Sequence, residues 1–241
     1  MAVRARYRTA AAVNGKPKSR CRAGQCLIAL SSAAMLTACA GGPASPDWQR
    51  QAHAALDRSV TAYLGGDSRV AAQEFDLART QLARTGRIDL MARAELRRCA
   101  AQLASLDFKP CEGFETIRID AAAAERAYAD FLTADLKQED AALLAPSQRV
   151  LAAMDLAGDP AQAMRDLGDP LSRLVAAGVL LRAGRANPEV IALAVDTASS
   201  QGWRRPLLAW LNLQARRAEQ AGATAEAERL RRRIEWTLKP P

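Results

Sequence analysis

Three proline dipeptides divide the C-terminal part of the chain into short segments: Asp159-Pro160, Asp169-Pro170 and Asn187-Pro188. An Asp or Asn side chain accepts hydrogen bonds from the free amides at a helix start, and proline fits the first helical position because the amide it lacks would be unpaired there. Each dipeptide therefore predicts the beginning of a helix. Apolar residues recur at helical spacing between these starts, and no stretch alternates as a strand does. The pattern predicts an all-α fold.

The chain between Pro46 and these dipeptides carries the same helical signals. Paired glycines and a later single glycine stop two helices. Only residues 107–120, which contain Pro110 and Gly113, lack helical periodicity. Besides the three proline starts, we expect one helix ended by Gly65-Gly66, one ended by Gly86, and helices over Ile88–Leu106, Ala121–Thr133, Asp135–Leu144, Pro146–Leu156, Pro206–Ala221 and Thr224–Leu238.

The stretch GDSRVAAQEFDLA, residues 66–78, resembles the second half of a tetratricopeptide repeat. In that family, small residues let paired helices approach and an aromatic residue fills the gap between them. Ala71, Phe75 and Ala78 occupy those positions, whereas the last predicted helix pair departs from the pattern at Arg231. No repeat period runs through the whole chain. The resemblance implies antiparallel helical hairpins stacked as a short, tetratricopeptide-like solenoid.

The beginning of the chain differs from everything after it. Cys26–Ala38 is an uncharged run of thirteen residues, and a helix of that length spans about 20 Å, short of the ~30 Å hydrocarbon core of a bilayer. Seven Lys or Arg residues and no acidic residue precede it. A basic start followed by such an apolar region is typical of a cleaved signal peptide. We therefore predict a signal peptide over residues 1–38, and not a transmembrane helix.

The end of this run, Leu36-Thr37-Ala38-Cys39, resembles the lipobox of bacterial lipoproteins. The resemblance implies that a signal peptidase recognises Leu36, Thr37 and Ala38, cleaves before Cys39, and leaves that cysteine acylated. Ala40 stands where lipoproteins of the inner membrane often carry aspartate, which implies an anchor in the outer membrane, facing the periplasm. The alternative is an ordinary secretory signal with a chance cysteine.

A short tether follows the predicted cleavage site. Residues 39–46 hold the lipidated cysteine and small or turn-forming residues, and seven flexible residues reach about 15 Å. The helical domain, residues 47–241, is therefore expected close to the membrane surface. No second apolar stretch is long enough to cross a bilayer.

Net charge gives a misleading indication of the partner. The whole chain has a formal charge of +8, which would favour nucleic acid. Loss of the predicted signal peptide removes seven basic residues and leaves 27 Lys and Arg against 26 Asp and Glu. We therefore expect no nucleic-acid partner.

Two cysteines, Cys99 and Cys111, remain beyond Cys39. In an oxidising compartment the simplest outcome is one disulfide, whose loop of about thirteen residues would contribute roughly 3 kcal/mol of stability. The alternative is two unpaired thiols. A metal site needs more ligands than these cysteines and His53 offer, so we expect neither a metal nor another cofactor.

Catalytic residues are not recognisable in this sequence. A nucleophilic triad usually needs a histidine base, and His53 is the only histidine. Neighbouring acids such as Glu139-Asp140 or Glu112 and Glu115 fit a solvated surface better than a catalytic pair. We therefore do not expect an enzyme.

Trp203, Arg204 and Arg205 form a candidate partner surface, because tryptophan and arginine are favoured at interface hot spots. The alternative is an indole packed into the hairpin turn with its arginines in water.

These features predict a lipid-anchored helical scaffold that binds a protein partner in envelope assembly, secretion or cell-wall maintenance. The alternative is a binder of a small molecule or a peptidoglycan fragment, in a helical groove that includes residues 108–120. An envelope hydrolase would need a polar catalytic cluster that these residues do not supply.

Overall fold

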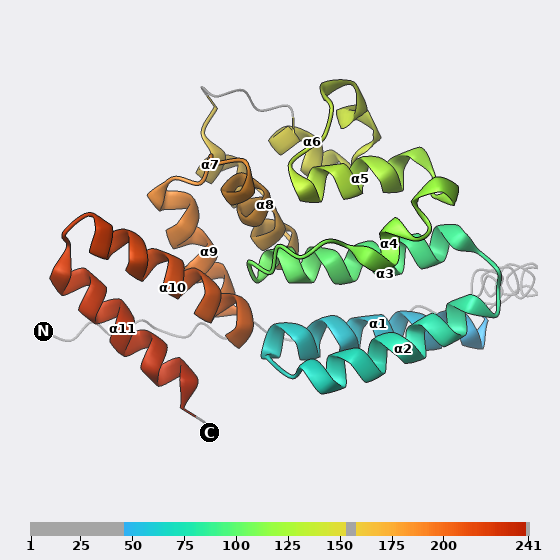
Figure 1. Ribbon diagram of the computed structural model, residues 1–241, viewed down its shortest axis with the longest axis horizontal. Helices are drawn as coiled ribbons and strands as arrows, with labels where there is room; N and C mark the ends of the chain where they lie inside the picture. Colours follow the sequence, from blue (N-terminus) through green and yellow to red (C-terminus); the bar gives the residue numbers. More distant parts are fainter. Residues whose placement is uncertain (1–45, 153–157, 240–241) are drawn as a thin grey trace, which may run out of the picture. The chain divides into compact units, whose positions relative to one another are not determined.

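The computed structural model describes residues 46–152 and 158–239, which form helices joined by loops and contain no strand (Figure 1). This confirms the all-α prediction. The predicted signal peptide, its recognition residues Leu36, Thr37 and Ala38, and Cys39 lie outside the described residues. The longer helices are α1 (Asp47–Gly65), α2 (Ser68–Ala83), α3 (Ile88–Ala104), α5 (Ala123–Thr133), α8 (Pro170–Arg182), α9 (Pro188–Ser200), α10 (Arg204–Gln220) and α11 (Thr224–Leu238); α6 (Pro146–Ala152) and α7 (Pro160–Arg165) are shorter.

Side-chain caps start the three helices that begin with proline. Asp159, Asp169 and Asn187 each accept a hydrogen bond from a backbone amide in the first turn of α7, α8 and α9. Such a cap satisfies a donor that has no partner inside the helix. These helices therefore begin at the residues that the sequence predicts.

Helices that follow one another in the sequence pack together, as in a solenoid. α1 contacts α2, α8 contacts α9, α9 contacts α10, and α10 contacts α11. Figure 1 shows α1 with α2, and α10 with α11, as antiparallel hairpins. α3 has a wider set of neighbours, because it also contacts α1, α2, α5 and α8.

The first hairpin is packed as the tetratricopeptide resemblance implies. Ala71, Phe75 and Ala78 of α2 are all buried, and the Ser59 hydroxyl of α1 donates a hydrogen bond to the Ala71 carbonyl oxygen at 2.8 Å. In the last hairpin Arg231 is exposed and pairs with Glu219 of α10. The last hairpin therefore keeps a buried small residue, Ala227, but has an arginine in the place of the buried aromatic residue.

The contact between α3 and α8 is unusually close. A side chain at Gly178 of α8 would meet Leu103 of α3, with a Cβ only 2.8 Å from the Leu103 Cγ and 2.9 Å from its carbonyl oxygen. Beyond this contact, the indole nitrogen of Trp210 on α10 donates a hydrogen bond to the Ala104 carbonyl oxygen at 3.0 Å. The last turn of α3 thus touches both α8 and α10.

The prediction of a helix over Asp135–Leu144 is wrong in extent and type. Only η2 (Gln138–Leu143) is helical there, and it is a 3-10 helix. Ala134 adopts a left-handed conformation with φ of 62° and ends α5, while Pro146 disfavours helical geometry at the residue before it. α5 therefore stops before this segment, and Pro146 separates the segment from α6.

We predict that Gly178→Ala lowers the free energy of unfolding by about 1–3 kcal/mol, because the new methyl group forces α3 and α8 apart. Urea unfolding followed by circular dichroism measures this. Gly168→Ala is the matched control, since a Cβ there meets no atom within 4 Å. Equal unfolding curves for the Gly178 variant and the parent chain would contradict the close packing.

Candidate functional site

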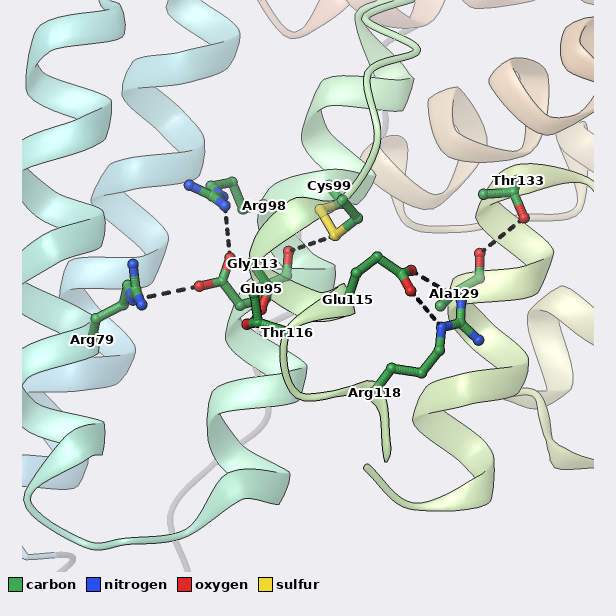
Figure 2. Close-up of a disulfide and its surroundings, with 11 residues drawn as sticks. Arg79, Glu95, Arg98, Cys99, Gly113, Glu115, Thr116, Arg118, Ala129 and Thr133 are labelled. Carbon is green, nitrogen blue, oxygen red and sulfur yellow. Dashed lines mark hydrogen bonds and ion pairs between the residues drawn. A yellow bond between two sulfur atoms is a disulfide. The ribbon is translucent and has the colours of Figure 1, made fainter. Parts of the chain in front are cut away.

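Residues 107–120, called the braced segment from here on, follow α3 and pack back against it. They contain the short helix α4 (Glu112–Glu115) and the 3-10 helix η1 (Arg118–Asp120), both in contact with α3. A disulfide joins Cys111 of this segment to Cys99 of α3, with Cα atoms 5.8 Å apart (Figure 2). The irregular part of the sequence is therefore held to a helix by a covalent bond.

A buried carboxylate lies beside the disulfide. Glu95 of α3 is only 1% exposed, and its Oε2 accepts a hydrogen bond from Arg98 at 2.7 Å. Arg79 of α2 forms an ion pair with Oε1 at 3.4 Å (Figure 2). Gly113 packs on this carboxylate, since a Cβ there would lie 2.2 Å from Oε2. The absence of a side chain at residue 113 thus allows the braced segment to cover the ion pair.

The far end of the braced segment is fixed by Arg118. Its guanidinium donates to both carboxylate oxygens of Glu115, at 2.8 and 3.1 Å, and to Asp130 of α5 at 3.0 Å. These hydrogen bonds, the one to Glu115 first, raise the pKa of Arg118. The Phe114 side chain is fully buried below it, whereas Ile119 is 88% exposed. A rigid turn therefore presents an apolar side chain to solvent.

A cavity of about 270 Å³ opens beside the braced segment. The disulfide and other residues of the braced segment form part of its wall, and α3, α5 and α8 supply the remainder. Charged groups of both signs, Asp107, Lys109, Glu115 and Arg182, surround an apolar floor. This cavity lies where the sequence analysis places its alternative ligand groove.

The predicted partner surface at Trp203, Arg204 and Arg205 is largely taken up by internal contacts. Arg205 donates to the Tyr63 carbonyl oxygen at 2.6 Å and to the Ser68 hydroxyl at 2.7 Å, and its guanidinium lies 4.3 Å from the centre of the Tyr63 ring. Trp203 is half-buried against the core, and only Arg204 is exposed. Arg205 thus joins α10 to the first hairpin.

Tyr63 is held at the same junction. Burial and the charge of the Asp107 carboxylate raise the pKa of Tyr63 to about 12. Its hydroxyl lies 3.4 Å from Asp107, at the beginning of the braced segment. The contact connects the first hairpin to that segment.

Sequence reasoning missed the two buried carboxylates, Glu95 and Glu125. Glu95 follows Ala92 by three residues and precedes Leu96, so it lies on the apolar face that the spacing predicts for this helix. An acid within such a face is a readable signal of a buried ion pair. Glu125 has no such local signal, because its partner Arg93 lies 32 residues away in the sequence.

Two features are absent from residues 46–152 and 158–239. There, no group of three or more His, Cys, Asp or Glu side chains is arranged to hold a metal ion. No helix in the same ranges combines the length and the apolar character that a membrane span requires. His53 lies on the exposed face of α1 and pairs with Asp57 at 2.9 Å.

Comparison with known proteins identifies no family for this chain. No protein-family model matches it, and neither a curated protein nor a solved structure does so. Its function has to be inferred from the residues and their geometry.

We predict that the double substitution Cys99→Ala with Cys111→Ala lowers the free energy of unfolding by roughly 3 kcal/mol, the value for a closed loop of this length. Chemical unfolding with and without a thiol reductant measures it. The reductant should shift the parent chain toward the double variant and leave the double variant itself unchanged. Identical unfolding of all four samples would show that the disulfide does not brace the segment.

Proposed function

We propose that the protein is a non-enzymatic lipoprotein, anchored through Cys39 in the outer membrane and facing the periplasm, whose helical domain binds a protein partner. The partner would act in envelope assembly, secretion or cell-wall maintenance. The braced segment is the surface that we assign to this contact. The observation that carries the proposal is the 88% exposure of Ile119 on a segment that the disulfide and the ion pairs of Arg118 hold in place.

The anchor is supported by the order of features at the start of the chain. A basic region, an uncharged run, the sequence Leu36-Thr37-Ala38-Cys39 and a tether follow one another without interruption. Each acyl chain buries apolar carbon in the bilayer, and two or more chains make a stable anchor. A protein so anchored needs no spanning helix.

The contact surface is supported by the way in which Ile119 is held. It is the most exposed of the large apolar side chains in the described part of the chain. Its neighbour Arg118 is fixed to Glu115 and Asp130, and the disulfide holds the start of the segment. A segment whose backbone is already held in place loses less conformational entropy on binding, which favours affinity. Ile119 is therefore the residue to test.

We predict that Cys39→Ser abolishes incorporation of labelled palmitate and leaves the leader attached, because the lipid-bearing thiol is lost. Metabolic labelling and intact mass measure both effects. Cys99→Ser is the matched control and should keep the label. Palmitate that persists in the Cys39 variant would exclude this anchor.

We predict that a photo-crosslinking amino acid in place of Ile119 captures one discrete protein in intact cells, because the side chain lies in the interface. The same probe at Leu77, an exposed position on α2, is the control and should not capture that protein. The Ile119 crosslink should weaken when Cys99 and Cys111 are both replaced by alanine. Crosslinks that are the same at both positions, or absent at both, would count against the assigned surface.

The cavity beside the braced segment favours a second candidate function. Its volume of about 270 Å³ and its mixed charges suit a small polar ligand, such as a fragment of peptidoglycan. Mass spectrometry of the gently purified protein distinguishes the two functions, since a bound small molecule leaves with denaturation and a crosslinked partner does not.

A further inference from the structure

A second and larger cavity, of about 380 Å³, lies between α3, α5 and α8. These helices contact one another in pairs, and η2 and the start of α6 close the remaining side. Figure 1 shows α5 and α8 on the same side of α3. Among the described residues, only Leu96 lines both this cavity and the one beside the braced segment. Its volume falls within the range of small-molecule sites, about 300–1,000 Å³. This space between α3, α5 and α8 is called the amine cavity from here on.

One wall of the amine cavity carries a carboxylate that is only half satisfied. The Glu125 side chain of α5 is 8% exposed, and its Oε1 accepts a hydrogen bond from the Arg93 Nε at 2.8 Å. Its Oε2 is buried and has no hydrogen-bond partner among the described residues. A buried carboxylate oxygen without a donor is costly. A group that brings a donor to Oε2 is therefore favoured.

Tyr128 adds a second polar group to the same wall, one turn further along α5. Its hydroxyl forms no hydrogen bond with another described residue. Burial, and to a smaller extent the Asp169 carboxylate, raise the pKa of Tyr128, so the phenol stays neutral and its oxygen can accept a hydrogen bond.

The charges around the amine cavity favour a cation. Glu125 and Asp169 line it, together with Arg93 and Arg97. Arg93 is paired with Glu125, and Arg97 with Asp57 of α1. With Asp57 included, which pairs with Arg97 but does not line the cavity, three carboxylates outnumber two guanidinium groups by one, and an anion would find both guanidinium groups occupied. The rest of the lining is mostly apolar, with Leu96, Ala100, Leu144, Leu171 and Val175.

We propose that the amine cavity binds a primary ammonium group on an aliphatic stem, with the nitrogen at Glu125 and Tyr128 and the stem against the apolar wall. An ammonium offers three donors, enough for both oxygens. The stem buries its methylene groups, which is favourable in an apolar cavity. This site does not depend on the proposed scaffold role. A free aliphatic amine and a lysine side chain share this chemistry.

The test is an NMR titration of the full chain in non-ionic detergent, with labelled leucine and valine methyl groups. The probes are n-butylamine, lysine blocked at its amino and carboxyl groups, and butan-1-ol as the uncharged control. Leu171 and Val175 methyl signals should shift with at least one amine, at a concentration about tenfold or more below that needed for the alcohol. The tighter of the two amines identifies the source. Equal response to butan-1-ol and to both amines would overturn the proposal.

Three substitutions, one of them a control, test where the amine binds. Glu125→Gln keeps the shape of the side chain and should weaken amine binding about tenfold or more, because the charge is lost. Glu189→Gln is the matched control, since Glu189 pairs with Arg165 on an exposed surface and does not line the cavity; it should leave binding unchanged. Ala124→Trp fills the rim from an exposed position and should abolish binding even if the Glu125 variant unfolds. Binding that survives the Ala124 substitution would place the amine elsewhere.

Discussion

The close approach of α3 to α8 at Gly178 is a main link between the two ends of the helix array, beside the contact that Arg205 makes with α1. α3 also packs on α1, α2 and α5, and α8 on α9, so this contact connects the first hairpin with the C-terminal helices. Small residues permit it: Ala100 and Ala104 of α3 and Ala177 of α8 are all buried. Because dispersion attraction falls off steeply with the distance between atoms, a wider spacing of α3 and α8 would weaken this contact. Both cavities are bounded by these helices, and their walls are therefore set by the spacing that Gly178 allows.

The sequence was sufficient where a structural feature depends on neighbouring residues. Asp169 caps α8 through the amide of Ser172, three residues away, and such a pairing can be read from a short pattern. The wrong prediction of a helix before Pro146 shows the limit of reading short patterns. Ala134 ends α5 in a left-handed conformation, and the residues that usually signal this conformation, glycine and asparagine, are not present at that position. Arg205 is a more distant case. It bonds the carbonyl of Tyr63, 142 residues earlier, and only the packing of α10 on α1 brings the two together.

The two buried carboxylates, Glu95 and Glu125, differ in their surroundings. Glu95 interacts with arginines of α2 and α3, and Gly113 covers it, so it supports the braced segment. Glu125 has a single arginine partner and faces a cavity. Within the described part of the chain, one oxygen of each carboxylate lacks a hydrogen bond. That of Glu95 has the Arg79 guanidinium 3.4 Å away, whereas Glu125 lines a cavity in which a ligand can supply the missing donor. The first carboxylate therefore belongs with the protein contact that we propose, and the second with the amine cavity.

The disulfide connects the position of the anchor with the state of the contact surface. Disulfides form and persist in oxidising compartments and are rare where thiols are kept reduced. On the proposed route of export, the chain meets an oxidising environment only after it has left the cytosol. Until then Cys111 is not bonded to Cys99, and the start of the braced segment is held only by non-covalent contacts. The conformational entropy lost on ordering Ile119 and its neighbours then reduces the free energy of partner binding. Export would thus lower that cost, and the partner contact would form most readily in the compartment where the lipid anchor holds the protein.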